Sequence, residues 1–181
     1  LSSRTPDMAD WRFMDLDLTG AAGTSAFGFS GTGDNVLIYR VDMQDFGTGV
    51  GSGASVLNYW NSNCYPGHTL HDGLAIVEST IDHCQGGGGN NGMYLTGQRL
   101  MILGTSITDC DEVEHTLRTP WLEKAIISNS YLGASASAKH QLKLHAPGWD
   151  TPGLGYRHYS EQIIISDNVF QRETNPWSVT P

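Results

Sequence analysis

A ten-residue segment, Lys124-Ala-Ile-Ile-Ser-Asn-Ser-Tyr-Leu-Gly133, has the pattern of a short strand, a polar corner and a second short strand. A single segment of this kind cannot bury its apolar side. When the segment is stacked on copies of itself, its apolar side chains form continuous columns and become buried. Backbone hydrogen bonds join each copy to the next, and neighbouring strands lie roughly 4.8 Å apart. The segment therefore predicts a stack of similar units.

Copies of this segment recur along the chain as pairs of large apolar residues five positions apart. Their successive steps are 25, 38, 26, 25 and 38 residues, and the pairs are Phe13/Leu18, Ile38/Met43, Ile76/Ile81, Ile102/Ile107, Ile127/Leu132 and Ile165/Phe170. A period near 25 with occasional insertions is typical of a solenoid. Four corner residues, Ser79, Thr105, Ser130 and Asn168, occupy one place in this pattern, where their side chains can hydrogen-bond to a bent backbone.

A second set of strand-like segments shares one register, with an apolar Leu at the third place of each. The steps between them are 25, 22 and 25 residues, and the segments are His68–His71, Met93–Thr96, His115–Arg118 and His140–Lys143. If these leucines point into the core, the residues on either side of each point outward. The outward set contains His71, Tyr94, Thr96, Arg118, Gln141 and Lys143, and His145 follows on the last segment.

The repeat and its Ile-Ser-Asn-Ser-Tyr-Leu and Ile-Ser-Asp-Asn-Val-Phe corners resemble the right-handed parallel β-helix of the pectate-lyase-like superfamily, from about Trp11 to Phe170. We expect an all-β solenoid of about six to seven rungs. Two long loops, Gly47–Gly67 and Gly148–Ser160, would account for the two 38-residue steps. The main competitor is a β-sandwich, and the fixed register across six segments argues against it.

Composition favours one small extracellular domain over residues 1–181. The net charge of -9 makes nucleic acid or an anionic membrane surface an unexpected partner, and no apolar run is long enough for membrane insertion. The chain begins at Leu1 without a signal peptide, so we expect a processed, secreted or cell-surface protein, or a piece of a longer one. Exposed ends of the stack would favour self-association.

Three cysteines leave one unpaired in a monomer. Cys84 and Cys110 each lie three residues beyond the column residues Ile81 and Ile107, so we expect them at the same place in neighbouring units. Their spacing suits either a disulfide or an unbonded ladder, and Cys64 is the other candidate partner.

The resemblance implies a polysaccharide lyase, which cleaves uronate chains by β-elimination with Arg or Lys as the base, often beside calcium. Such chemistry needs a cation against the carboxylate, a base and an acid. We therefore expect catalytic roles for Arg118, Lys143, His71, Tyr94 and His145, and substrate contacts from Thr96, Gln141, Trp60, Trp149 and Tyr156. The alternative is that Arg118 and Lys143 simply form ion pairs with Glu114 or Asp72 on a solvated sheet face. His115 and His140 share the parity of the inward leucines, so we expect them to be core groups.

The acidic segment Asp109-Cys-Asp-Glu-Val-Glu114 precedes the Arg118 strand. Its carboxylates, Asp109, Asp111, Glu112 and Glu114, would suit calcium, which takes six to eight oxygen ligands. A merely solvated acidic turn is the alternative. Three functions stay open on the sequence alone: a polysaccharide lyase, a noncatalytic glycan-binding protein, and a structural segment of a surface or filament protein.

Overall fold

The computed structural model describes residues 2–3, 7–21, 24–29, 32–48, 55–59, 72–86, 91–110, 115–119, 122–133, 140–144 and 160–171. Within these ranges the chain is all-β and its strands pair in parallel. None of these residues lies in a helix, so none of them forms a helix that is long and apolar enough to cross a membrane.

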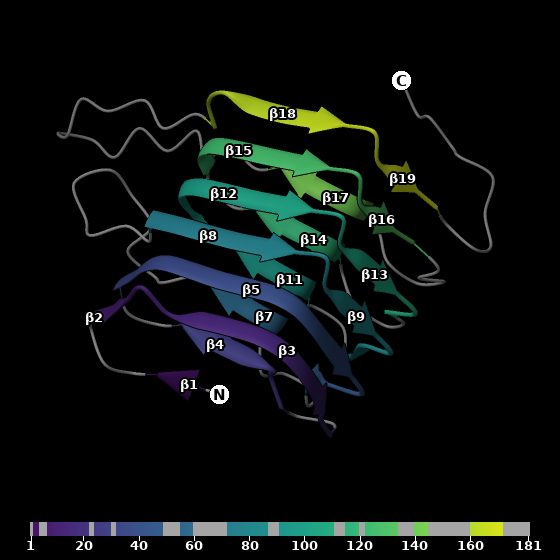
Figure 1. Ribbon diagram of the computed structural model, residues 1–181. Coiled ribbons are helices and arrows are strands. Elements are labelled where there is room, and N and C mark those ends of the chain that lie inside the picture. The colour runs from purple at the N-terminus through teal and green to yellow at the C-terminus, as the bar shows by residue number, and fades with distance from the viewer. Residues whose placement is uncertain are drawn as a thin grey trace, which may run out of the picture.

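Two large parallel sheets face each other, with the apolar core between them. The first sheet contains β1 (Ser2–Ser3), β4 (Phe27–Phe29), β7 (Ser55–Tyr59), β11 (Asn91–Leu95), β14 (His115–Thr119) and β17 (His140–Leu144), in that order. Figure 1 shows these strands as a layer behind the strands of the second sheet, and each of them is followed along the chain by a strand of the second sheet.

The second sheet bends, so that it has a long flank and a short flank (Figure 1). The long flank contains β2 (Asp7–Ala9), β3 (Arg12–Thr19), β5 (Thr32–Gln44), β8 (Asp72–Val77), β12 (Gly97–Leu103), β15 (Leu122–Ser128) and β18 (Ile163–Ser166). The short flank continues from β5 through β9 (Thr80–Asp82), β13 (Ser106–Thr108), β16 (Tyr131–Leu132) and β19 (Val169–Phe170). A separate pair joins β6 (Gly47–Thr48) to β10 (Gln85–Gly86).

The predicted apolar columns are confirmed in every pair of neighbouring repeats. Ile38, Ile76, Ile102, Ile127 and Ile165 are consecutive register partners, and Phe13 precedes them. The second column runs through Leu18, Met43, Ile81, Ile107, Leu132 and Phe170. Ile165 is 41% exposed, whereas Ile76, Ile102 and Ile127 are buried. Its strand β18 ends the sheet, and no described strand lies on its far side.

The corner between the two flanks carries the predicted side-chain hydrogen bonds. The backbone N–H of Thr105 donates to the Ser130 hydroxyl at 3.2 Å, and that of Ser130 donates to Asn168 Oδ1 at 2.9 Å. In the same way Val41 N–H donates to the Ser79 hydroxyl at 3.2 Å. The side chains of Ser79, Ser130 and Asn168 thus satisfy the equivalent backbone N–H of the preceding repeat. The Thr105 hydroxyl instead donates to the Ile76 carbonyl of the preceding repeat at 3.3 Å.

The residue before each corner has a left-handed backbone conformation, which the sequence analysis did not predict. The φ angles lie between 47° and 59°, at Asp15, Arg40, Glu78, Gly104, Asn129 and Asp167. This conformation turns the chain from one flank to the other. Its conformational energy is higher for other residue types than for Gly, Asn and Asp. Arg40 and Glu78 adopt it although their types do not favour it, because the stacked neighbours fix the bend.

Two predictions about chain segments are wrong. The strand beside β11 is Ser55–Tyr59, not His68–His71, and it lies inside the segment that we predicted to be one long loop, as does β6. The register of β11 is also displaced by two residues, since Leu117 pairs with Met93 and Arg118 with Tyr94. The other predicted loop, Gly148–Ser160, lies outside the described residues except for its last one.

The open choice for the cysteines is decided in favour of a bond. Cys84 and Cys110 form a buried disulfide with their Cα atoms 4.2 Å apart, across 26 positions of the chain. Cys64 lies outside the described residues. The bond joins neighbouring repeats in the same direction as the backbone hydrogen bonds.

Replacing both Cys84 and Cys110 with Ser should lower the free energy of unfolding by about 3 kcal/mol, because the bond restricts the unfolded chain over a loop of this length. Urea denaturation of the double variant and of the wild type under non-reducing conditions measures the difference. An unchanged midpoint would contradict a disulfide at this place.

Gly104→Ala should lower the free energy of unfolding by about 1 kcal/mol, because alanine is strained in the left-handed region. The cost comes from the backbone alone, since an added Cβ would lie in ordinary contact, 3.6 Å from Glu78 Cγ. Gly104→Asn is the matched control and should lose less, because Asn tolerates this conformation better. Equal losses in the two variants, measured by urea denaturation, would argue against a left-handed corner.

Candidate functional site

Three polar side chains with basic or phenolic groups form a row on the outer face of the first sheet. Tyr94, Arg118 and Lys143 are register partners on β11, β14 and β17. The Arg118 guanidinium lies 5.3 Å from the centre of the Tyr94 ring, a distance at which a cation is attracted to the ring face. All three side chains are half-buried. We call these residues the Tyr94–Arg118–Lys143 row.

The row confirms the predicted alternation. Leu117 is fully buried, and Arg118 lies beside Lys143 on the other side of the sheet. Of the two partners in the ion-pair alternative, Asp72 pairs with Arg99 instead, and Glu114 lies outside the described residues.

The prediction that Gln141 and Thr96 are exposed substrate contacts is wrong. Gln141 is buried, and its Oε1 accepts a hydrogen bond of 2.6 Å from the buried Thr116 hydroxyl. Thr96 is buried beyond the end of β11, and the displaced register puts Tyr94 rather than Thr96 beside Arg118. Trp60, Trp149, Tyr156, His71 and His145 lie outside the described residues.

His115 and His140 share the inward parity, but the prediction that both are core groups is confirmed for His115 alone and is wrong for His140. His115 is fully buried, whereas His140 is exposed at the end of the sheet. Their Nδ1 atoms lie 3.2 Å apart, so one ring donates a hydrogen bond and the other accepts it. They extend a polar column that includes the buried Ser55 and Asn91. This column lies on the side of the sheet that faces the core.

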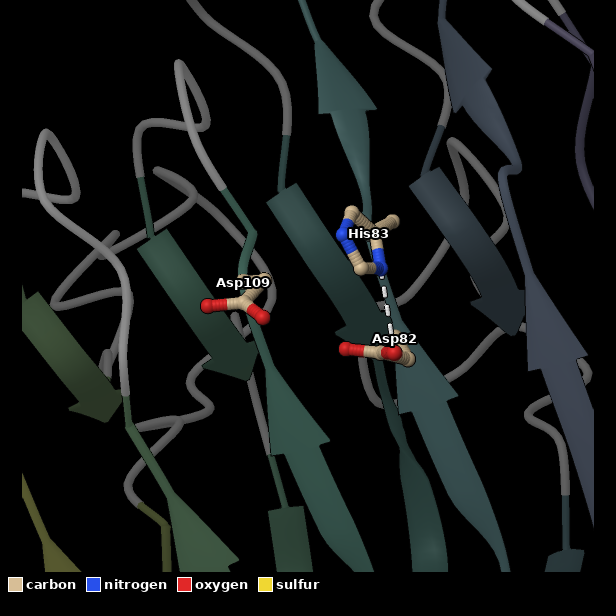
Figure 2. Close-up of side chains that lie close together, drawn as sticks. All are labelled: Asp82, His83 and Asp109. Atoms are coloured by element: carbon tan, nitrogen blue, oxygen red, sulfur yellow. Dashed lines mark hydrogen bonds and ion pairs between the residues drawn. The ribbon is translucent and has the colours of Figure 1, made fainter.

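A second cluster of ionisable groups lies at the end of the short flank. Figure 2 shows Asp82, the last residue of β9, beside His83, which follows it, and Asp109, which follows the neighbouring strand β13. One potential ligand atom from each residue lies within 4.8 Å of the others. The Asp82 carboxylate accepts hydrogen bonds from the Thr108 hydroxyl at 2.6 Å and from His83 Nδ1 at 3.0 Å.

The donor set of this cluster bears on the calcium prediction. Two carboxylates and one imidazole suit ions such as zinc better than calcium, which prefers six to eight oxygen ligands. Of the residues predicted to bind calcium, Asp109 belongs to the cluster, and Asp111, Glu112 and Glu114 lie outside the described residues. Asp82 and His83 were not predicted as site residues, although the sequence contained a signal for them. His83 and Asp109 are 26 positions apart, and this is also the spacing of the column residues Ile81 and Ile107 that precede them by two positions.

The two charges of the cluster support each other. Partial burial acts to raise the pKa of Asp82, but hydrogen bonds from Thr108 and His83 outweigh it, so the pKa lies below its usual 3.8. The hydrogen bond to Asp82 raises the pKa of His83 above 6.5, with smaller contributions from Asp109 and Asp45. The Asp82 contribution to stability is lost as pH falls through its lowered pKa, and the His83 contribution is lost as pH rises through its raised pKa.

Comparison of the chain with family models, with curated proteins and with solved structures finds no significant match.

Because the hydrogen bond to Asp82 raises the pKa of His83, the contribution of His83 to stability should depend on pH. His83→Asn keeps a side chain that tolerates the left-handed φ of 52° and removes the charge. The difference in unfolding midpoint between wild type and variant should be largest between pH 3.8 and 6.5, where both charges are present, and should shrink at pH 9. Urea denaturation across this range measures it, and a difference that grows toward pH 9 would contradict the ion pair.

Proposed function

We propose that this chain is a right-handed parallel β-helix, and that it is an extracellular carbohydrate-active protein that binds a uronate-containing polysaccharide along the Tyr94–Arg118–Lys143 row. The helix is supported by the parallel sheets and by apolar columns that keep one register through six repeats. The resemblance of the corners to the pectate-lyase-like superfamily supports the same fold.

The observation that carries the binding proposal is the register of Arg118 with Lys143. Two cations side by side on neighbouring strands, in a chain of net charge -9, form a local site for carboxylates. The row spans two strand spacings, about 10 Å, so it can meet more than one unit of an extended sugar chain. The Tyr94 ring, held against Arg118, adds an apolar face for a sugar ring.

The enzymatic form of the proposal is β-elimination. Arg118 offsets the uronate carboxylate, which makes the proton on the adjacent carbon more acidic. Lys143 is the base that takes this proton, a carbon–carbon double bond forms, and the glycosidic carbon–oxygen bond breaks. The Tyr94 hydroxyl gives a proton to the leaving oxygen. Tyr94 and Lys143 lie on opposite sides of Arg118, so base and acid come from different strands.

Noncatalytic glycan binding is the second candidate. The register of Arg118 with Lys143 supports it equally, because two neighbouring cations can hold a carboxylate whether or not a proton is then moved. A structural segment that neither binds nor cleaves is the third, and the same experiment separates all three.

The disulfide supports a location outside the reducing cytosol, since such bonds persist in oxidising compartments. We include a divalent cation in the proposal, with Asp82, His83 and Asp109 as the described groups that would hold it. The activity assays of the proposed test should therefore include calcium, zinc and a chelator in separate samples.

The test uses the wild type and single variants on a panel of uronate polysaccharides. Binding is measured by isothermal titration calorimetry, and cleavage by the ultraviolet absorbance of unsaturated uronates. Lys143→Ala should lower the rate of product formation by at least about a hundredfold and weaken binding only slightly, because it removes the base. Arg118→Ala should weaken binding by about tenfold or more and also slow cleavage, because it removes a charge-assisted contact.

Lys124→Ala is the matched control, since Lys124 is an exposed cation on the other sheet, and it should change neither quantity. Binding without product, with both row variants weakened, would favour the noncatalytic protein. If the wild type binds no uronate polysaccharide, the proposed function is wrong and the structural segment remains.

A further inference from the structure

A groove with a volume of about 670 Å³ lies on the outer face of the second sheet, away from the Tyr94–Arg118–Lys143 row. Its floor is a row of aliphatic side chains that are register partners on five adjacent strands: Leu37, Ala75, Met101, Ile126 and Ile164. Met101, Ile126 and Ile164 are 38%, 40% and 56% exposed. Alternation accounts for this row, because the neighbours Ile38, Ile76, Ile102 and Ile127 take the inward places.

One side of this aliphatic row is cationic. Arg99 and Lys124 are register partners two positions before Met101 and Ile126, so they project from the same face. Arg99 is held in place by Asp72, which accepts two hydrogen bonds of 2.6 and 2.8 Å from its guanidinium. Lys124 is exposed and takes part in none of the ion pairs of the described residues. Arg12, the register partner of Leu37, closes the end of the row.

The charge of the groove differs in sign from that of the chain. Arg12, Arg99 and Lys124 line it, and its described lining contains no Asp or Glu. The whole chain has 19 acidic against 10 basic residues. A lining of this kind is complementary to an anion that also carries a long apolar part.

The dimensions of the groove fit a small amphiphile. Five strands extend over about 19 Å, and the volume lies within the range of about 300–1,000 Å³ that small-molecule sites show. A uronate chain fits this floor poorly, because aliphatic side chains leave the sugar hydroxyls without hydrogen-bond partners. We propose that the groove binds a free fatty acid, with its alkyl chain along the aliphatic row and its carboxylate against Lys124 and Arg99.

The probe is dodecanoate below its micelle-forming concentration, titrated into the full chain in a calorimeter. Dodecyltrimethylammonium, with the same chain length and the opposite charge, is the matched ligand. Dodecanoate should bind with one molecule per chain and at least about tenfold more tightly than the ammonium compound, because the cationic side discriminates between the head groups.

The protein variants separate the floor from the cationic side. Lys124→Glu should weaken dodecanoate binding about tenfold, and Met101→Glu should weaken it further, because it puts a negative charge on the floor itself. Both side chains are exposed, so circular dichroism should show an unchanged fold. Lys143→Glu, a charge reversal on the other sheet, is the control and should leave dodecanoate binding as it is.

Three results of the binding experiments would overturn the inference: no binding of dodecanoate, equal binding of the two amphiphiles, or binding that Lys143→Glu weakens as much as Lys124→Glu does. A dimer of the wild type that Met101→Glu dissociates, seen by analytical ultracentrifugation, would also overturn it, because a second copy of the chain would then occupy the groove.

Discussion

The in-register pairing of parallel strands from neighbouring repeats is the interaction on which the rest of this structure depends. No repeat has enough apolar surface to form a core alone, so Ile38, Ile76, Ile102 and Ile127 become buried only by lying on one another. The backbone hydrogen bonds that fix this register also fix every other side chain of the repeat. The corner hydrogen bonds and the disulfide join the same neighbours in the same direction.

One consequence is that polar side chains far apart in the sequence become neighbours on a surface. Tyr94, Arg118 and Lys143 are brought together in this way, and so are Asp82 and Asp109. The two sheets then present different chemistry to solvent: a basic and aromatic row on the first, and an aliphatic groove with a cationic side on the second. A rigid stack can hold both without either site distorting the core, because inward and outward residues alternate.

The sequence predicted the columns because a large apolar residue recurs at the same two places of each repeat. It did not predict the displaced register of β11, in which Met93 rather than Leu95 is the partner of Leu117. A shift of two residues leaves the same side chains inward and outward, so the alternation of apolar and polar residues could not reveal it. The strand Ser55–Tyr59 was hidden beside a glycine-rich segment. The burial of Gln141 was also missed, because it depends on its contact with Thr116, which parity alone does not reveal.

The most direct measurement is a crystal structure of the protein with a bound uronate oligosaccharide. The account predicts parallel strands in the register described, with sugar carboxylates within hydrogen-bond distance of Arg118 and Lys143 and a sugar ring near Tyr94. A sugar bound elsewhere on the protein, or strands in which Arg118 and Lys143 are not neighbours, would contradict it.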